Sequence, residues 1–337
     1  MKAVGFTKAL PASDPKAFMD FEPEQPTPEG HDMRIAVRAV AVNPVDTKLR
    51  RAQTEALDTP RILGFDACGV VDAVGPDVTL FKAGDAVFYA GDSTRSGSNA
   101  QYQLVDERIV GRKPATLSNA EAAALPLTSI TAWESFFDRL GIDPDGANTG
   151  ESILIIGGAG GVGSVGIQLA KTAGLTIIAT ASRPETVEWC KALGADYIIN
   201  HHEDMVAQTR SAGFDYVDHV AIFNDMRHWN TAVELIRPQG GIVTIDATDL
   251  PMDMAVMKTK AASLHWEFMF ARPIHKTPDM VAQHKLLNRV ADMVDAGTLR
   301  TTANHVLSPI SAETIRKAHE MVERGDVRGK IVIEGWD

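Results

Sequence analysis

The sequence predicts an α/β protein in which a doubly wound parallel sheet is inserted into a β-rich module. The chain has 337 residues, more than the roughly 250–300 at which single hydrophobic cores stop growing, so we expect two domains. Strand-like runs fill the first third. Between residues 152 and 247, apolar runs alternate with helical periods. This alternation predicts right-handed βαβ crossovers and a parallel sheet covered on both faces.

The first third is predicted to be rich in β-strands. β-Branched and apolar runs, bounded by Gly, Pro, Asn or Asp, predict strands at 34–46, 69–75, 84–91 and 101–105. The Pro-rich stretch 22–30 is expected to be a polar turn between two strands. Residues 117–141 then read as helix.

The middle of the chain carries the alternation in detail. Strands are predicted at 152–157, 176–181, 197–200, 214–222 and 240–247, and helices at 165–174, 185–196, 203–213 and 225–241. The last part, with helices at 281–297 and 311–325 and a strand at 329–336, is closer in character to the first module. We therefore assign residues 1–126 and 272–337 to one domain and residues 127–271 to the inserted sheet domain.

Charge and composition narrow the partners and the compartment. The formal net charge is −11 with a pI of about 5.4, which disfavours binding to nucleic acid or to an anionic membrane. No apolar stretch approaches the roughly 20 residues that span a bilayer, and no secretory signal is visible. Cys68 and Cys190 both stand in apolar surroundings and read as buried thiols. We expect a cytoplasmic protein.

A glycine-rich turn in the middle domain predicts dinucleotide binding. Gly158, Gly160 and Gly163 fit G-x-G-x-x-G directly between the strand 152–157 and a helix. The first glycine allows the tight turn, the second lets the backbone approach a pyrophosphate, and the third lets the helix pack against the strand. The helix start, which includes Gly161 and Val162, would offer free N–H groups to that pyrophosphate.

The end of the next strand favours NADPH over NADH. NAD-binding proteins place a carboxylate about 20 residues after the glycines, on the ribose 2′-hydroxyl. This chain has Ala181, Ser182 and Arg183 there. A hydroxyl and a guanidinium suit a 2′-phosphate. The alternative is that Arg183 only caps a surface turn.

Several stretches, taken together and in order, resemble one enzyme superfamily. They are 41–50, 63–71, 97–105, 122–136, 157–171 and 265–270. They resemble the medium-chain dehydrogenase/reductase superfamily, and within it the zinc-free quinone oxidoreductase branch and its subgroup labelled zinc-type alcohol-dehydrogenase-like. The resemblance implies a Rossmann-type domain inserted into a GroES-like catalytic domain, and a homodimer.

Departures from the zinc alcohol dehydrogenases of that superfamily argue against zinc. Those enzymes have a cysteine where this chain has Asn43, and a histidine followed by glutamate where it has Phe65 and Asp66. A catalytic zinc needs about three protein ligands. The densest histidine cluster, at 201–202, reads as a solvated loop. We therefore predict no metal.

The resemblance also implies roles for single residues. Asn43 and Asp46 should lie at the floor of the catalytic cleft, where zinc would otherwise sit, and Thr128 should contact the nicotinamide carboxamide. The end of the segment 265–270, with Phe268 and Phe270, should lie near the nicotinamide. The stretch 264–270 is also apolar enough for a sheet-edge strand at a dimer interface, although core burial gives the same composition.

Two further residues are candidates for the catalytic site, and each has an alternative structural interpretation. Lys48 stands where many quinone reductases have a tyrosine and would steady a cofactor phosphate or a substrate oxygen; the alternative is a solvent-facing side chain. Tyr89 is a candidate hydrogen-bond donor to substrate; the alternative is a buried aromatic residue that holds a strand.

Without zinc to polarise a carbonyl, the acceptor of the hydride must already be electron-poor. We therefore expect an NADPH-dependent reductase of a quinone or an α,β-unsaturated carbonyl. The alternatives are a reductase of enoyl thioesters, an NADPH-binding protein without turnover, and a zinc-dependent alcohol dehydrogenase with relocated ligands. The sequence does not identify the natural acceptor or a proton donor.

Overall fold

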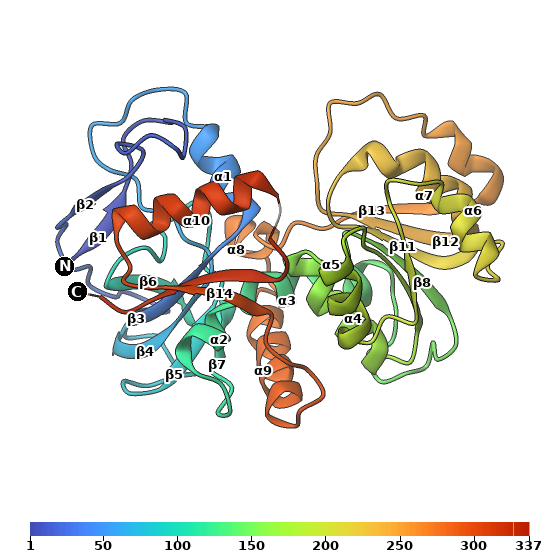
Figure 1. The fold of residues 1–337 in the computed structure, drawn as a ribbon. Coiled ribbons are helices and arrows are strands. Elements are labelled where there is room, and N and C mark those ends of the chain that lie inside the picture. Colours follow the sequence, from blue (N-terminus) through green and yellow to red (C-terminus); the bar gives the residue numbers. More distant parts are fainter. Residues whose placement is uncertain (326, 337) are drawn as a thin grey trace. The chain divides into compact units, whose positions relative to one another are not determined.

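The computed structural model describes residues 1–325 and 327–336, and the chain forms two compact units (Figure 1). Unit 1 combines Met1–Leu127 with Phe270–Asp337, and unit 2 is Thr128–Met269. Unit 2 is therefore inserted into unit 1 along the sequence. Leu127, Phe270 and Ala271, which we had placed in the insert, belong to unit 1.

Unit 2 is built on a six-stranded, all-parallel sheet in the order β10-β9-β8-β11-β12-β13. The central strand β8 is buried at every position, as expected for a parallel sheet covered on both faces. The doubly wound sheet that the sequence predicts is confirmed. Its strands are β8 (Ser152–Ile156), β9 (Thr176–Thr180), β10 (Tyr197–Ile199), β11 (Val217–Ile222), β12 (Ile236–Thr244) and β13 (Ser263–Trp266).

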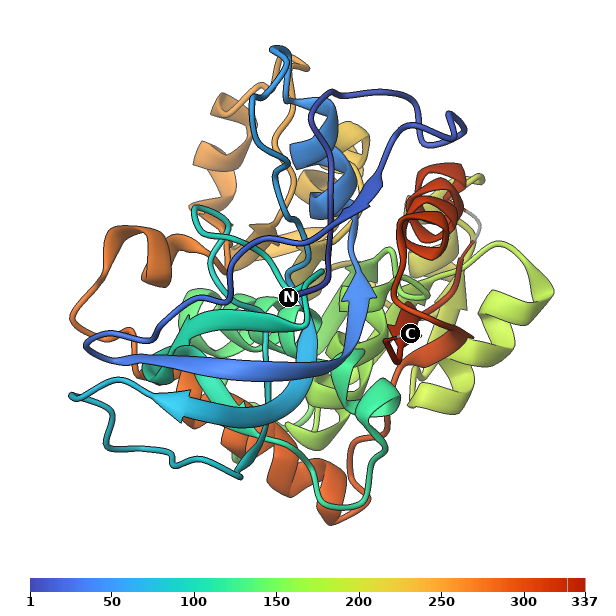
Figure 2. The same ribbon diagram turned by 90° about the vertical axis from the view of Figure 1, so that its left-hand side faces the viewer.

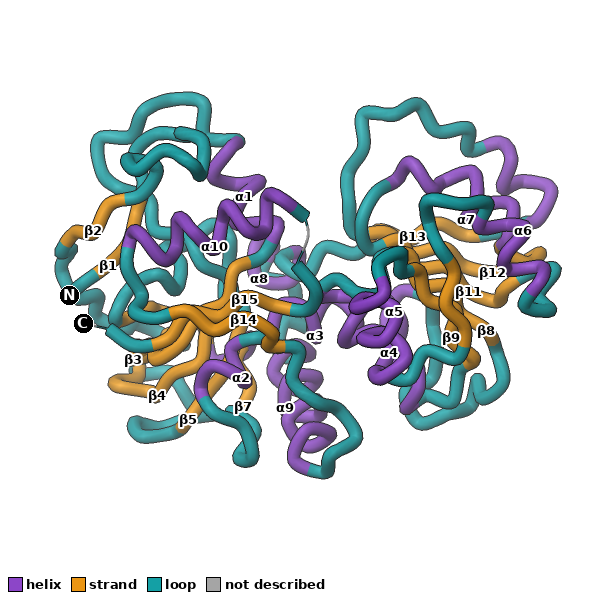
Figure 3. Tube along the Cα trace, viewed as in Figure 1, coloured by secondary structure: helices purple, strands orange, loops and turns teal. Residues whose placement is uncertain are grey.

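Helices lie on both sides of this sheet (Figure 3). Helix α4 (Gly161–Thr172) packs on β8 and β9 and contacts α5 (Pro184–Leu193), whereas α7 (Trp229–Leu235) packs on β12 and contacts α6 (Met205–Ser211). The apolar core under α6 and α7 joins residues of five strands, β8 to β12. The short helical segments are η2 (Glu134–Arg139), η3 (Met226–His228) and η4 (Ala255–Lys260).

Unit 1 contains a seven-stranded sheet in the order β14-β15-β3-β4-β5-β7, with β6 pairing beside β3. Figure 2 shows β3 and β4 running side by side across this unit. The last strand, β15, pairs with the last four residues of β3, 39–42. The strands are β3 (Asp32–Val42), β4 (Ala67–Val74), β5 (Ala86–Tyr89), β6 (Tyr102–Asp106), β7 (Val110–Arg112), β14 (Ala303–Leu307) and β15 (Lys330–Glu334), with a separate pair of β1 (Ala3–Gly5) and β2 (Met19–Phe21).

The remaining helices of unit 1 lie around its strands. Helix α10 buries Ile315, Ala318 and His319 on one face and contacts α1 and β3. Its N-terminus is capped by Ser311, and Gly325 at φ +72° ends it. These helices are α1 (Pro44–Arg51), η1 (Glu107–Ile109), α2 (Asn119–Ala123), α8 (Ala271–His275), α9 (Ala282–Asp295) and α10 (Ala312–Arg324), while α3 (Pro126–Trp133) crosses the division between the units.

Several predicted element bounds are wrong. The strand expected at 34–46 ends at Val42, because Asn43 is at the N-cap position of a helix that has proline at its first position. The helix expected at 117–141 is divided into α2, α3 and η2, because Pro126 cannot continue α2. The helix expected at 225–241 ends at Leu235, and the strand expected at 240–247 already runs from Ile236 to Thr244, with Pro238 inside it.

No helix in the described part of the chain is long and apolar enough to cross a bilayer.

Candidate active site

The glycine-rich turn of unit 2 joins β8 to α4 and leaves backbone amides free. Gly157 adopts φ +94°, and its N–H donates to Thr180 Oγ1 at 2.9 Å, which ties the turn to the end of β9. The first helical bond of α4 runs from the Ser164 N–H to the Gly160 carbonyl at 2.9 Å. The amides of residues 161–163 precede that bond. These N–H groups lie at the N-terminus of α4, where they and the positive end of the helix dipole would stabilise an anion.

The glycines of this turn differ in what a side chain would meet. A Cβ on Gly163 would lie 2.2 Å from the Gly157 carbonyl oxygen, so helix and strand approach too closely for any other residue. A Cβ on Gly158 would lie 3.0 Å from Ala179 Cβ and 3.3 Å from Cys190 Sγ. A Cβ on Gly160 would meet nothing closer than 3.4 Å. Packing therefore explains Gly163, whereas Gly160 leaves space above the turn that fits the close approach of a pyrophosphate.

Ser182 and Arg183 follow the carboxyl end of β9, beside the end of β10. Both are partly exposed, and the Ala181 N–H donates to the Ile199 carbonyl at 3.0 Å. Arg183 is the N-cap of α5, and its Nε lies 3.2 Å from Glu185 Oε1 with two-fifths of the side chain exposed. The contact of Arg183 with a ribose phosphate remains a prediction.

The histidines after β10 form a cluster instead of a fully solvated loop. The rings of His201 and His202 lie 4.2 Å apart, and His228 lies 6.3 Å from His201. Burial lowers the pKa of His201 and of His228, and neighbouring positive groups add to the effect on His201. His202 is exposed and His201 only half-buried, so part of this loop is solvated as expected.

In unit 1, Asn43 and Asp46 lie together at the start of α1. Both are buried, with about 1 % of their surface exposed. The Asn43 N–H donates to Asp46 Oδ2 at 2.8 Å, and the Gly64 N–H donates to Asp46 Oδ1 at 3.1 Å. Burial raises the pKa of Asp46 to about 7, against the lowering effect of its hydrogen bond from Asn43 and of the charge on Lys330.

Asp66 and Lys330 complete this buried polar cluster. Asp66 Oδ2 lies 2.7 Å from Lys330 Nζ and accepts from Asn43 Nδ2 at 2.9 Å, while Oδ1 accepts from the Leu127 N–H at 2.7 Å. Lys330 Nζ also donates to Asn43 Oδ1. We name Asn43, Asp46, Asp66 and Lys330 the buried polar cluster.

Sequence reasoning missed Lys330. The one sequence signal was a lysine at the first position of the otherwise apolar strand 330–334. A lysine at the start of a strand is ordinarily read as exposed. Only the pairing of β15 with β3 shows that it faces inward beside Asn43.

Lys48 and Tyr89 have different surroundings. Lys48 lies on α1 and is exposed. Tyr89 is 1 % exposed, and its hydroxyl donates to Gln103 Oε1 at 2.9 Å. That bond uses the single phenolic hydrogen, so donation from Tyr89 to a substrate would require the bond to Gln103 to break.

The predicted nicotinamide contacts lie in both units. Thr128 is buried in unit 2, where Phe268 is half-exposed just after the edge strand β13. Phe270 is buried in unit 1, and its ring packs edge-on against Phe65 at 5.2 Å. The edge position of β13 is confirmed, and the dimer interface remains a prediction.

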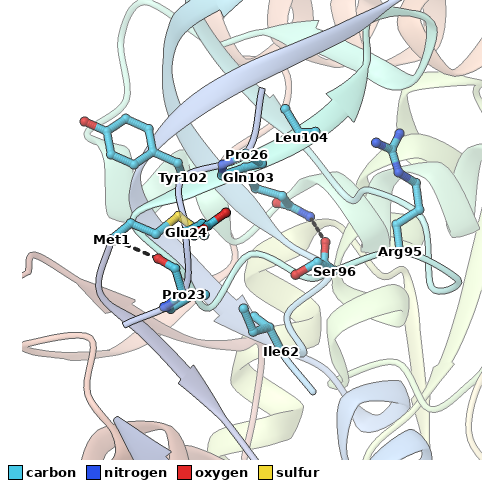
Figure 4. A pocket seen from close by; sticks show the side chains of 10 residues that line it. All are labelled: Met1, Pro23, Glu24, Pro26, Ile62, Arg95, Ser96, Tyr102, Gln103 and Leu104. Carbon is cyan, nitrogen blue, oxygen red and sulfur yellow. Dashed lines mark hydrogen bonds between the residues drawn. The ribbon is translucent and has the colours of Figure 1, made fainter. Parts of the chain in front are cut away.

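A cavity of about 230 Å³ lies in unit 1 between the N-terminal segment and β6 (Figure 4). Met1, Pro23, Ile62 and Leu104 line it, together with Gln103, whose Nε2 donates to the Ser96 carbonyl at 3.0 Å. None of the predicted site residues lines this cavity.

The residues at the expected zinc position do not fit that ion. Asn43 offers an amide and Phe65 packs against Phe270, so of these three positions Asp66 alone carries a zinc-type ligand, and its carboxylate is paired with Lys330. Zinc sites in proteins use thiolate, imidazole and carboxylate ligands. Among residues 1–325 and 327–336, no three His, Cys, Asp or Glu side chains are grouped so that they could hold a metal ion.

Known protein families match both parts of the chain. Residues 29–123 match the alcohol dehydrogenase GroES-like domain, and residues 193–333 match the zinc-binding dehydrogenase family. A zinc-type alcohol dehydrogenase-like protein of Staphylococcus aureus (strain MSSA476) is 48 % identical over 335 residues, 99 % of each chain. The 2-methylene-furan-3-one reductase of Solanum lycopersicum is 32 % identical over 89 % of this chain and 70 % of its own length.

Solved structures share the whole fold. A putative zinc-dependent alcohol dehydrogenase protein from Rhizobium etli CFN 42 has a TM-score of 0.95 and 51 % identity, covering 100 % of this chain and 98 % of the other. The quinone oxidoreductase from Coxiella burnetii has a TM-score of 0.82 and 27 % identity, covering 100 % of this chain and 99 % of its own.

Proposed function

The chain belongs to the medium-chain dehydrogenase/reductase superfamily, and we propose that it transfers a hydride from NADPH to a quinone or an α,β-unsaturated carbonyl without a metal ion. The superfamily assignment makes it an oxidoreductase of an NAD(P)H-binding family. The preference for NADPH, the class of acceptor and the absence of zinc are our proposal, as are a homodimer and a cytoplasmic location.

The buried polar cluster is the observation that carries the proposal. At the position where a zinc enzyme would hold its metal ion, Lys330 Nζ lies 2.7 Å from Asp66 Oδ2 and donates to Asn43. A saturated alcohol or aldehyde needs polarisation at its oxygen before hydride can leave or arrive. A quinone or enone spreads the incoming negative charge over its conjugated system, and hydrogen-bond donors are sufficient to stabilise it.

The residues of unit 2 that fit a dinucleotide are the glycine turn and the residues after β9. We assign the amides at Gly161, Val162 and Gly163 to the pyrophosphate, with Gly160 leaving room for it and Gly158 allowing the tight turn against β9. Ser182 and Arg183 are assigned to the 2′-phosphate. When bound, the nicotinamide supplies the hydride.

Two of the compared proteins support this acceptor class, and two point elsewhere. The tomato relative is named for reduction of an enone and the Coxiella structure for a quinone. The Staphylococcus relative and the Rhizobium structure are named for zinc-type or zinc-dependent alcohol dehydrogenases. The oxygens of Asn43 and Asp66 are occupied by Lys330 and not by zinc. For this chain we therefore favour the enone and quinone reductases over the zinc-type enzymes.

The test is NADPH oxidation, followed by the absorbance of the reduced nicotinamide, with quinones, enones and aldehydes, each with and without a chelator. We expect turnover of quinones or enones that the chelator leaves unchanged, and less than one zinc per ten chains by elemental analysis. Chelator-sensitive turnover of aldehydes would instead establish a zinc alcohol dehydrogenase. Tight NADPH binding without oxidation by any acceptor would establish a binding protein.

A further inference from the structure

Lys330 brings a positive charge into the interior of unit 1. Its residue exposure is 3 %, and its partner Asp66 is fully buried. Three oxygens face Nζ: Asp66 Oδ2 at 2.7 Å, Asn43 Oδ1, and the Val42 carbonyl at 3.4 Å. Lysine is almost never buried unless its charge is paired, so these oxygens account for its place.

The sheet, and not the flexible side chain alone, determines where this ammonium lies. β15 pairs antiparallel with β3 so that Ile331 stands opposite Val42, which places Lys330 next to Asn43. On its other side, the Lys330 N–H donates to the Thr302 carbonyl at 2.9 Å, just before β14. The backbone that carries the ammonium is thus held from both sides.

Asn43 is held at both ends of its amide. Its Oδ1 accepts from Lys330, and its Nδ2 donates to Asp66 Oδ2 at 2.9 Å. Turning the amide over would place its nitrogen against the ammonium and its oxygen against the carboxylate, and both contacts would then be repulsive. The ion pair therefore selects a single orientation of Asn43.

The charges of the cluster require a cation. Asp46 and Asp66 are both buried, and Lys330 is the cation that acts on both of them. Burying an uncompensated carboxylate is costly, and removing one partner of a buried ion pair leaves that cost in place. Without the ammonium, the cluster would have to gain protons or take up another cation.

We propose that the Lys330 ammonium is the resident cation of the buried polar cluster, that it holds the Asn43 amide in its orientation, and that it excludes a metal ion from this position. Val42, Asn43 and Asp66 present oxygens, which are the ligands of hard divalent cations such as Mn²⁺. A metal ion and the ammonium would need the same oxygens. The inference does not depend on the proposed acceptor or cofactor.

Lys330→Ala and Lys330→Met separate loss of charge from loss of volume. The alanine variant removes the charge and leaves a space, because the atoms lost beyond Cβ are those of propylammonium. The methionine variant removes the charge and fills most of the space. We expect Lys330→Ala to bind one Mn²⁺ at least tenfold more tightly than wild type, measured by electron paramagnetic resonance. Lys330→Met should bind Mn²⁺ no more tightly than wild type does. Adding Asp66→Asn to Lys330→Ala should abolish that binding.

Chemical rescue gives a second readout. Propylammonium should raise the melting temperature of Lys330→Ala and leave Lys330→Met and wild type unchanged, and 1-propanol, which has the same shape without charge, should not replace it. A folded Lys330→Ala that responds to Mn²⁺ and propylammonium no more than Lys330→Met does would overturn the proposal.

If Lys330→Ala does not fold, a mutant cycle of Lys330→Met, Asp66→Asn and the double variant tests the same proposal by urea unfolding. Asp66→Asn should restore at least half of the midpoint lost in Lys330→Met, because it removes the charge that the ammonium balances. Strictly additive midpoints would contradict it. None of these measurements uses turnover, so an enzyme inactive toward quinones and enones would refute the proposed function and leave this inference standing.

Discussion

At the scale of single residues, Arg183 is the side chain on which the NADPH preference depends. It stands at the N-cap of α5 beside Ser182, with two-fifths of its side chain exposed. Charged hydrogen bonds contribute about 1.5–3 kcal/mol each. We therefore expect Arg183→Ala to raise KM for NADPH at least tenfold while KM for NADH changes less than twofold.

Steady-state kinetics with both cofactors checks this prediction. Arg227→Ala is a suitable control, since Arg227 is an exposed arginine of unit 2 paired with Asp225 at 2.6 Å. Equal loss with NADPH and NADH in Arg183→Ala would show that Arg183 supports the fold of the turn and does not read the 2′-phosphate.

His319 makes a second prediction at this scale. It is fully buried on α10, its ring packs 4.8 Å from Phe18, and neither ring nitrogen has a hydrogen-bond partner among the described residues. Burial, helped by the charge of Arg50, lowers the pKa of His319 to about 3. The unfolded chain therefore takes up this proton near pH 6.5, and the folded chain does not.

Stability from neutral His319 is thus present above pH 6.5 and is lost as pH falls from 6.5 toward 3. A shift of one pKa unit corresponds to about 1.4 kcal/mol, so His319→Leu should gain about 3 kcal/mol relative to wild type between pH 6.5 and 4. Urea unfolding across that range measures it. His275→Gln, on an exposed histidine, is the control. Parallel curves for wild type and His319→Leu would contradict the prediction.

At the scale of elements, alanine substitutions at two glycines of the same turn should have different effects. Gly163→Ala places a Cβ 2.2 Å from a backbone oxygen, and Gly160→Ala places one 3.4 Å from its nearest neighbour at an ordinary φ of −71°. Overpacking typically costs about 1–3 kcal/mol. We expect Gly163→Ala to lower the melting temperature by several degrees, and Gly160→Ala to keep it while weakening NADPH binding at least tenfold.

Thermal unfolding and fluorescence titration with NADPH separate the two effects. An unchanged NADPH affinity in folded Gly160→Ala would mean that no ligand approaches this turn closely. An unchanged melting temperature in Gly163→Ala would mean that α4 can shift away from β8.

The same elements show which parts of the structure a sequence can predict. The alternation of buried strands and helices in unit 2 depends on local periodicity, and it predicted the parallel sheet correctly. The start of α1 was missed although Asn43, Pro44 and Asp46 carry the cap signal, because the apolar β-branched run before them indicates a strand. The six-residue π-helical turn η2 carries no sequence signal that we recognise.

The buried polar cluster shows the limit more sharply. Asn43 and Asp46 were identified as site residues, and Asp66 was noted only as a replaced glutamate. Lys330 lies 264 residues from its partner Asp66, and sheet register brings the two together. Register between segments so far apart follows from the assembled sheet and not from local pattern.

At the scale of the whole molecule, the division into two units predicts which part of the chain NADPH should protect from hydrogen exchange at early times. The glycine turn and Arg183 belong to unit 2, whereas the β1–β2 pair belongs to unit 1. We expect NADPH to slow amide hydrogen exchange several-fold at residues 157–164 and 181–183. Exchange in β1 and β2 should stay unchanged at early times, because bound ligand suppresses local opening where it makes contact.

Hydrogen exchange followed by mass spectrometry checks this, with NADH and free adenosine as comparison ligands. Uniform protection of both units, with no excess at the glycine turn, would show that NADPH stabilises the chain without using the predicted turn.

The pairing of β15 with β3 also has a consequence for the growing chain on the ribosome. All of unit 2 is translated before Lys330, whereas the β3 segment of unit 1 must wait for residues 330–334. Until those residues leave the exit tunnel, one edge of β3 at residues 39–42 presents unpaired backbone groups, which invite wrong pairing. Asp46 and Asp66 meanwhile have no ammonium beside them. Biosynthesis therefore finishes unit 1 last, and a nascent chain halted before β15 would carry a complete nucleotide-binding unit beside an unfinished sheet.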